Sequence, residues 1–392
     1  MNTKHYRFAA LLLVSFGWFH ILAGRLGLST LLLPIEEHLS IGHTEAGLAL
    51  SAMWLLYGLM QFPSGIISDI KGRKLTLLLS MILFSLAYFL VGFSSHYYMF
   101  FIALLILGIG SGGYQTAGIA MLTDLFTKGR GRALGIQSSA GSLSGLIPMV
   151  ASLIAMYYWK AFFYLWALLG FLGSVLFLLY TRESTTLPSK VSYRERIIDG
   201  IRVLRQREIL VIFVANLVMS ITWIGYMSFF PTYLIEGKSF SPLLASIALT
   251  ILMSGSILVR PFIGSLSDRY DKLWILLLLM GLVSFASFVL IFSPDPIVIL
   301  TMALVLSFTG GTFPVFSSYL MDQWEEKGRG GKLGFYRSLI ILCASPISAI
   351  IGTTASSYNF TVPFLGMAVL VIIGVLVVML KLLWRSRGVA SK

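Results

Sequence analysis

The sequence has little charge and almost no cysteine. Only 11% of its 392 residues are Asp, Glu, Lys or Arg, whereas soluble domains carry about 25%. The single cysteine, Cys343, excludes an internal disulfide, and no CxxC motif or Cys/His cluster is present to hold a metal. These shortages argue against redox chemistry, and we expect no metal and no other cofactor.

Hydrophobic residues are abundant instead. They make up 57% of the chain, and 37 glycines add to the part that is compatible with a membrane. This is enough for about a dozen spans of roughly 20 residues each, which excludes a soluble enzyme with a single anchor. The start, MNTKHYRF before a long apolar run, has no small-residue cleavage site, so we expect a retained first helix.

Polar residues, glycine and proline divide the apolar runs into twelve segments. The sequence therefore predicts an all-α membrane protein with 12 transmembrane helices. The predicted limits are 8–34, 43–67, 75–95, 97–124, 133–157, 160–181, 209–235, 241–267, 273–293, 297–322, 333–357 and 361–383.

The net charge of +13 has a topological explanation. Of the 29 Lys and Arg, 25 lie on the two termini, on loops of one side or, for Arg337 and Lys381, within five residues of a span end on that side. Only Lys160 and Lys238 lie on the other side, and Arg25 and Arg260 lie further inside spans. Basic residues collect in cytoplasmic loops. We therefore expect cytoplasmic termini and a multi-pass protein of the cytoplasmic (inner) membrane, with no nucleic-acid partner.

The two halves of the chain resemble each other. Asp69 and Asp268 lie 199 residues apart in similar loops, and Gly112-Gly113 and Gly310-Gly311 lie 198 residues apart. Parallel repeats of this kind are found in transporters. We expect two pseudo-symmetric six-helix bundles, over 1–181 and 209–392, joined by a cytoplasmic linker over 182–208 that contains an amphipathic helix.

Several loops carry a family resemblance. The segment from Gly65 to Lys74, GIISDIKGRK, resembles the loop between spans two and three of the major facilitator superfamily (MFS). Asp268-Arg269 is similar to its second copy, and the segment RGRALG from Arg130 resembles the family's entry to span five. The resemblance implies a secondary transporter with alternating access, a central cavity lined by spans 1, 4, 7 and 10, and no use of ATP.

Two departures bear on the substrate. Leu104 stands where many proton-coupled members have an arginine, and span five lacks the contiguous Gly-Pro of drug antiporters. A drug/proton antiporter is therefore less favoured. The resemblance also implies gating residues in the cytoplasmic loops, although charges at helix ends also serve solubility. The gating candidates are Gly65, Asp69, Gly72, Arg73, Asp124, Asp268, Arg269 and Asp322.

Arg25 and Arg260 are the main candidates for substrate contacts. A charge near the bilayer centre costs about 2.5–3.5 kcal/mol on the most lenient scale, and no acidic residue lies at similar depth in the predicted spans. An anion would stabilise them, because the arginine fork suits a carboxylate. The segment RPFIG from Arg260 also resembles the Arg-Pro-x-x-Gly of oxalate and monocarboxylate carriers. Structural roles in gating or helix packing are the alternative. We expect Arg337 to reach the membrane interface, with a position in the cavity as the alternative.

Other polar residues within the spans could complete such a site. His20 is a candidate for proton coupling, with a buried structural histidine as the alternative. The remaining candidate substrate contacts, each of which could instead serve helix packing, are Tyr114, Gln115, Asn216, Trp223 and Tyr226.

The leading hypothesis is a monomeric secondary transporter, not an enzyme, for a small organic anion. Its partners would be that small molecule and the lipid bilayer, with symport of protons left open. The first alternative is an exporter of drugs or neutral solutes of the same superfamily. The second is a membrane sensor or assembly factor that does not transport, which the lack of a sizeable extra domain disfavours.

Overall fold

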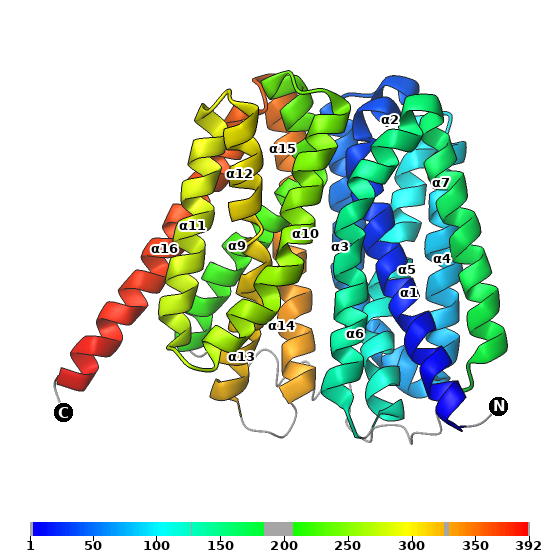
Figure 1. The fold of residues 1–392 in the computed structure, drawn as a ribbon, viewed down its shortest axis with the longest axis horizontal. Coiled ribbons are helices and arrows are strands. Elements are labelled where there is room, and N and C mark those ends of the chain that lie inside the picture. Colours follow the sequence, from blue (N-terminus) through cyan, green and yellow to red (C-terminus); the bar gives the residue numbers. More distant parts are fainter. Residues whose placement is uncertain (1–2, 127, 184–206, 325–328, 391–392) are drawn as a thin grey trace. The chain divides into compact units, whose positions relative to one another are not determined.

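The computed structural model describes residues 3–126, 128–183, 207–324 and 329–390, and within these ranges it contains helices and no strand. The chain divides into two compact units, Met1–Ser192 and Tyr193–Lys392. Each unit is a bundle of long helices (Figure 1). The amphipathic helix expected within 182–208 falls on residues 184–206, which lie outside the described ranges.

The first unit contains the helices from α1 to α7. Their bounds are α1 (Thr3–Thr30), α2 (Leu32–Leu39), α3 (His43–Lys71), α4 (Arg73–Phe93), α5 (Tyr97–Leu125), α6 (Arg130–Leu143), the short 3₁₀ helix η1 (Ser144–Leu146) and α7 (Ile147–Tyr180).

The second unit contains the helices from α9 to α16. Their bounds are α9 (Arg207–Thr232), the π-helical turn η2 (Tyr233–Gly237), α10 (Pro242–Ser267), α11 (Lys272–Phe292), α12 (Pro296–Leu306), α13 (Thr309–Gln323), α14 (Arg329–Ala344), α15 (Ile347–Ser357) and α16 (Thr361–Ala390).

Eleven helical stretches in the described ranges are long and apolar enough to cross a membrane. One of them, Arg130–Tyr180, has 51 residues, far more than the roughly 20 that one crossing needs. It is interrupted at Tyr158, whose backbone is extended (φ −162°, ψ 101°). Tyr158 lies between the predicted fifth and sixth spans, so the stretch corresponds to both, and the twelve predicted spans are all represented.

Several spans are less continuous than the sequence suggested. The predicted helix over 8–34 ends at Thr30 and resumes as α2 at Leu32, and the predicted helix over 297–322 is divided into α12 and α13. The predicted helix over 333–357 is likewise divided, with Pro346 between α14 and α15. Proline interrupts a helix because it lacks the N–H and crowds the preceding turn.

Glycines bring α5 close to α3 in the first unit. A Cβ on Gly108 would stand 2.5 Å from the carbonyl oxygen of Met53, and one on Gly112 would stand 2.6 Å from that of Tyr57. Small residues allow this approach, which is a common way to pack helices in a membrane. The close approach places the side chains of α3 and α5 within hydrogen-bonding reach of each other.

In each unit the first and last helices meet at one end of the bundle. The Tyr6 hydroxyl at the start of α1 donates to the carbonyl of Arg182, just after α7, at 3.0 Å. In the second unit, Lys381 of α16 donates to the carbonyl of Glu208 at the start of α9, at 2.7 Å. Because the chain enters and leaves each bundle at the same end, it passes along the bundle an even number of times.

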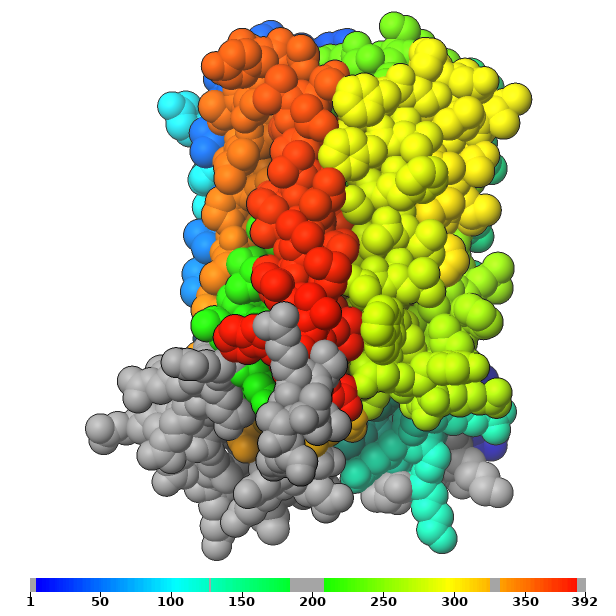
Figure 2. Space-filling view, turned by 90° about the vertical axis from the view of Figure 1, so that its left-hand side faces the viewer, coloured from blue at the N-terminus to red at the C-terminus, as the bar shows by residue number. Residues whose placement is uncertain are grey.

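The outer surface of the second unit is apolar where α16 crosses it. Figure 2 shows α16, in red, between α15 in orange and α11 in yellow-green. Ile373, Leu376 and Leu380 on this helix are 45%, 46% and 55% exposed. A helix with such a face is stable in lipid, where apolar side chains need no further cover.

Candidate functional site

Arg25 of α1 is almost completely buried in the first unit, with 3% of its surface exposed. Its Cζ lies 4.2 Å from the ring centroid of Tyr57 and 4.7 Å from that of Trp54, both on α3. The two rings meet edge to face, with an interplanar angle of 84°. Aromatic faces attract a guanidinium through their quadrupoles, so these two residues hold the charge in place.

The polar partner of Arg25 is a neutral side chain. Its Nη2 donates to the hydroxyl of Ser111 on α5 at 2.5 Å, while the Arg25 Nε is buried with no hydrogen-bond acceptor. Among the residues that the structure describes, no carboxylate forms an ion pair with Arg25. A buried charge without a counter-charge is costly, so this site favours an anion.

Gln115 is the one predicted neighbour that the structure brings to the Arg25 cluster. Its Oε1 accepts a 2.6 Å hydrogen bond from the Tyr57 hydroxyl, whose ring lies under Arg25. Tyr114 points elsewhere: it donates to the carbonyl of Val14 at 3.0 Å and fills the space beside Gly17. Tyr114 therefore joins α5 to α1.

His20 lies in an aromatic core one to two turns from Arg25 on α1. It is 1% exposed, its Nε2 is 2.7 Å from the carbonyl oxygen of Trp166, and its ring stacks on that indole at 5.6 Å. The Trp166 Nε1 donates in return to the carbonyl of His20 at 3.1 Å. These paired contacts fasten α1 to α7.

The predicted contacts in the second unit do not form one cluster. A Cβ on Gly310 of α13 would stand 3.5 Å from the Nε of Arg260, while Arg337 lies over the ring of Phe313 at 4.6 Å. Asn216 donates to the Tyr336 hydroxyl at 3.3 Å. Of the other two candidates, Tyr226 donates to Ser287 at 2.9 Å and Trp223 is half-buried.

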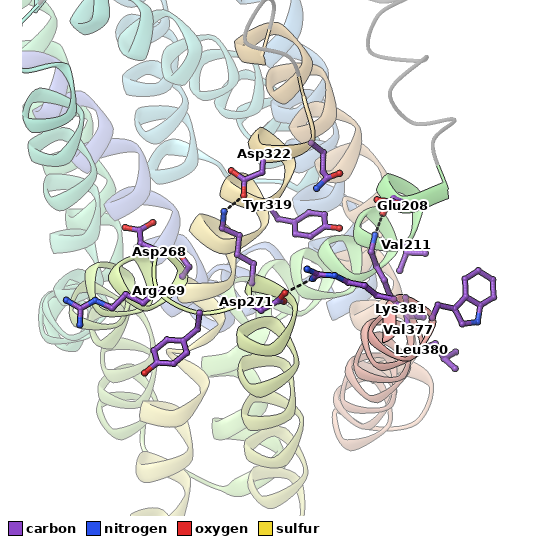
Figure 3. A pocket seen from close by; sticks show the side chains of 16 residues that line it. Glu208, Val211, Asp268, Arg269, Asp271, Tyr319, Asp322, Val377, Leu380 and Lys381 are labelled. Atoms are coloured by element: carbon purple, nitrogen blue, oxygen red, sulfur yellow. Dashed lines mark hydrogen bonds and ion pairs between the residues drawn. The ribbon is translucent and has the colours of Figure 1, made fainter. Parts of the chain in front are cut away.

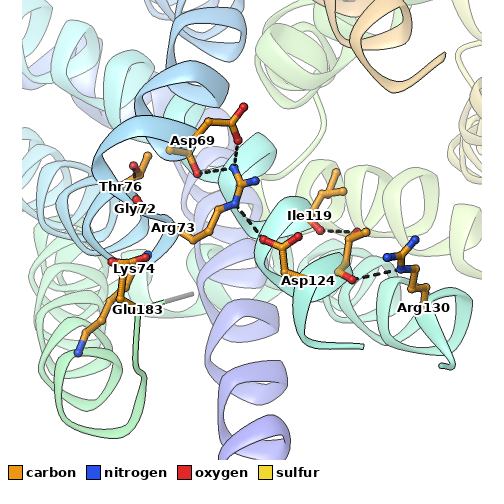
Figure 4. A network of polar contacts seen from close by, with 11 residues as sticks. Asp69, Gly72, Arg73, Lys74, Thr76, Ile119, Asp124, Arg130 and Glu183 are labelled. Carbon is orange, nitrogen blue, oxygen red and sulfur yellow. Dashed lines mark hydrogen bonds and ion pairs between the residues drawn. The ribbon is translucent and has the colours of Figure 1, made fainter. Parts of the chain in front are cut away.

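A network of charges closes one end of the first unit (Figure 4). Arg73 Nη1 lies 2.5 Å from Asp69 Oδ1 and 3.1 Å from the Ser68 hydroxyl, and its Nε lies 3.2 Å from Asp124 Oδ2. The network joins the ends of α3, α4 and α5. Arg73 therefore contacts two other predicted gating residues, Asp69 and Asp124. A Cβ on Gly65, which lies on α3 before Asp69, would meet nothing within 4 Å.

Glu183, just after α7, also lies at this end of the bundle, and no sequence motif predicted its role. Its Oε1 accepts a 3.1 Å hydrogen bond from the backbone N–H of Lys74, in the first turn of α4. Carboxylates stabilise helix N-termini in this way. Gly72 makes room for it, because φ is +104° there and a Cβ would stand 2.4 Å from the Glu183 carboxyl carbon.

The corresponding end of the second unit surrounds a cavity of about 970 Å³ (Figure 3). Asp268 and Arg269 line it, as do the ion pairs of Lys272 with Asp322 and of Arg385 with Asp271. Asp271 also accepts from the N–H of Leu273 at 2.8 Å, which caps α11. In the part of the chain that the structure describes, no three His, Cys, Asp or Glu side chains gather as metal ligands.

Several known transporters are similar to parts of this chain. The probable L-galactonate transporter of Escherichia coli (strain K12) is 31% identical over 45% of this chain and 40% of its own length. The hexuronate transporter of Bacillus subtilis (strain 168) is 24% identical over 53% and 51%. The multidrug resistance protein MdtG of Proteus mirabilis (strain HI4320) is 30% identical over 40% of each. The chain thus matches about half the length of these relatives or less.

The fold also matches a solved structure. A bacterial homologue of the human lysosomal transporter Spinster, crystallised in an inward-facing and unoccupied conformation, superposes with a TM-score of 0.81. The match covers 97% of both chains at 14% sequence identity. The sequence also matches the family model of the Major Facilitator Superfamily, over residues 8–254 and 212–392. The chain is therefore a multi-pass membrane protein that belongs to the Major Facilitator Superfamily.

Proposed function

We propose that this protein transports a small organic anion, and that Arg25 binds the negatively charged group. The observation that carries the proposal is the buried Arg25 guanidinium. It contacts two aromatic rings and a hydroxyl, and its Nε–H is buried without a hydrogen-bond acceptor. A carboxylate would supply both the missing charge and an acceptor for that N–H. Arg260 is the corresponding proposed contact in the second bundle.

The names of the relatives support an anion. L-Galactonate and hexuronates, the substrates that two of them are named for, each carry a carboxylate. One relative is named for multidrug resistance, which supports the alternative of a drug exporter. However, Arg25 would repel a cationic drug. The buried cation therefore favours the anion over the drug.

We also propose a cytoplasmic-membrane location with both termini on the cytoplasmic side. The support is the position of 25 of the 29 basic residues on the termini, on loops of one side or near the span ends on that side. The charge networks around Arg73 and Lys272 would then act as cytoplasmic gates. Proton coupling would require that either the substrate or His20 gains and loses a proton during transport.

The test is uptake of radiolabelled L-galactonate and D-glucuronate by the purified protein in liposomes. We expect saturable uptake, with an affinity about 10- to 100-fold lower in Arg25→Gln, because a charge-assisted hydrogen bond is worth about 1.5–3 kcal/mol. Arg132→Gln is the matched control, since Arg132 is exposed at the start of α6. Equal uptake by Arg25→Gln and the wild type would contradict the proposal.

A further inference from the structure

A buried polar face runs along α3 beyond the Arg25 cluster. It consists of Tyr57, Gln61, Ser64 and Ser68, which are 4%, 4%, 2% and 1% exposed. Residues spaced by three and four lie on one side of a helix. Two of them contact α5: Tyr57 donates to Gln115, and the hydroxyls of Ser64 and Thr116 are 2.9 Å apart.

Gln61 lies between these two satisfied contacts, but its own amide is not satisfied. Its Nε2 is buried and has no hydrogen-bond partner. Leaving a buried donor unpaired costs a protein free energy. Tyr57 and Ser64, on either side of it, have hydrogen-bond partners on α5. The Gln61 amide is therefore the group on this face that can hydrogen-bond a ligand.

Gln61 is also at a useful distance from Arg25. The guanidinium of Arg25 lies over the ring of Tyr57, and Gln61 follows Tyr57 by four residues on the same helix. Four residues advance a helix by about 6 Å. At about 1.5 Å per carbon–carbon bond, a chain of about four to six carbons covers that distance.

We propose that Gln61 is a specificity-determining residue that hydrogen-bonds a hydroxyl group of the substrate, a role that rests on the anion site proposed for Arg25. The substrate class is then a hydroxylated carboxylate, with its carboxylate at Arg25 and a hydroxyl at Gln61. A hydroxyl both donates and accepts, so it satisfies the amide in either orientation of its oxygen and nitrogen.

The chemistry predicts discrimination against carboxylates without hydroxyls. A site built to hydrogen-bond a hydroxyl rejects an analogue that lacks it, because the buried polar group is then left unpaired. A plain aliphatic acid would keep its contact with Arg25 but would leave the Gln61 amide unsatisfied. The wild-type protein should therefore bind sugar acids more tightly than alkyl carboxylates of the same length.

The experiment measures binding to the purified full-length protein by isothermal titration calorimetry. The probes are three sugar acids, D-gluconate, L-galactonate and D-glucuronate, and two hydroxyl-free acids, hexanoate and adipate. We expect Gln61→Leu to weaken binding of the sugar acids about 5- to 100-fold and to leave binding of hexanoate and adipate unchanged or tighter. Arg25→Gln should weaken binding of both groups.

Gln137→Leu is the matched control. Gln137 is another glutamine of the first unit, also 4% exposed, on α6. Its substitution should leave the preference for sugar acids intact, and thermal unfolding of each variant checks that it folds.

The outcomes separate this inference from the proposed function. If Gln61→Leu keeps wild-type affinity for the sugar acids while Arg25→Gln loses it, the anion site stands and the role of Gln61 is wrong; its amide then holds a water. The same conclusion follows if hexanoate or adipate binds as tightly as the sugar acids. If none of the five acids binds, the proposed function fails, and the role of Gln61 with it.

Discussion

The Nε of Arg73 lies 3.2 Å from Oδ2 of Asp124, and the second bundle repeats this pair as Lys272 with Asp322. The positions correspond at offsets of 199 and 198 residues, the period of the internal repeat. The two pairs differ in their exposure. The side chains of Arg73 and Asp124 are 16% and 18% exposed, whereas those of Lys272 and Asp322 are 18% and 59% exposed.

This difference predicts unequal coupling energies. Double-mutant cycles with Arg73→Gln and Asp124→Asn should give about 1–3 kcal/mol, because the pair is largely shielded from water and uses the arginine fork. The cycle with Lys272→Gln and Asp322→Asn should give less than about 1 kcal/mol, as for other surface pairs. Thermal unfolding of the purified variants measures both, and equal couplings would contradict the prediction.

Gly72→Ala should be strongly destabilising. The φ of +104° at Gly72 suits glycine, and the new Cβ would stand 2.4–2.6 Å from the carboxyl group of Glu183. The backbone strain alone costs about 1–3 kcal/mol, and displacing Glu183 removes the cap of α4. Adding Glu183→Ala should relieve the collision but not the strain, so the double variant should recover only part of the loss in melting temperature.

Gly135→Ala is the control for that prediction. Gly135 lies within α6, and a Cβ there would meet nothing within 4 Å. Alanine in a helix interior is favoured over glycine by roughly 0.5–1 kcal/mol. This variant should match the wild type or exceed its stability, and a loss comparable to that of Gly72→Ala would show that any added methyl group is harmful.

His20→Phe tests whether that histidine carries a proton or only packs. We expect a loss of about 1–3 kcal/mol in stability, because the carbonyl of Trp166 loses its buried donor, and we expect the pH dependence of anion uptake to stay unchanged. Uptake in liposomes across a pH series measures the second quantity. His5→Phe is the control, since His5 is exposed. A flattened pH profile with unchanged stability would identify His20 as the proton carrier.

The helices were predictable because a membrane leaves the backbone few choices. Every N–H and C=O in lipid needs an internal partner, so the apolar runs had to become helices, and the basic loops divided them correctly. The boundary at Tyr158, between the predicted fifth and sixth spans, was predictable too. An interruption inside a span was not: the predicted helix over 297–322 is divided into α12 and α13, and neither glycine nor proline stands between Leu306 and Thr309 to mark the division.

In the candidate site, only residues that are unusual for their sequence position, such as a charge within an apolar span, could be predicted. Arg25 stood out because a charge within an apolar span is rare. Trp54 and Tyr57 were missed because aromatic residues in a span are usually packing, although their spacing of three on one helix was a usable signal. Glu183 was missed because its partner, Lys74, lies 109 residues away.

Ser111→Asp should abolish anion transport while it stabilises the protein. Ser111 accepts a 2.5 Å hydrogen bond from Arg25, so a carboxylate at this position would form a buried ion pair and supply the charge that we assign to the substrate. Uptake of labelled L-galactonate should fall to background, and the melting temperature should rise. Ser111→Asn, which has nearly the same shape as Asp but no charge, is the control and should retain part of the uptake. Full transport in Ser111→Asp would contradict a role for Arg25 in binding the anion, because a neutralised guanidinium has little left to offer a carboxylate.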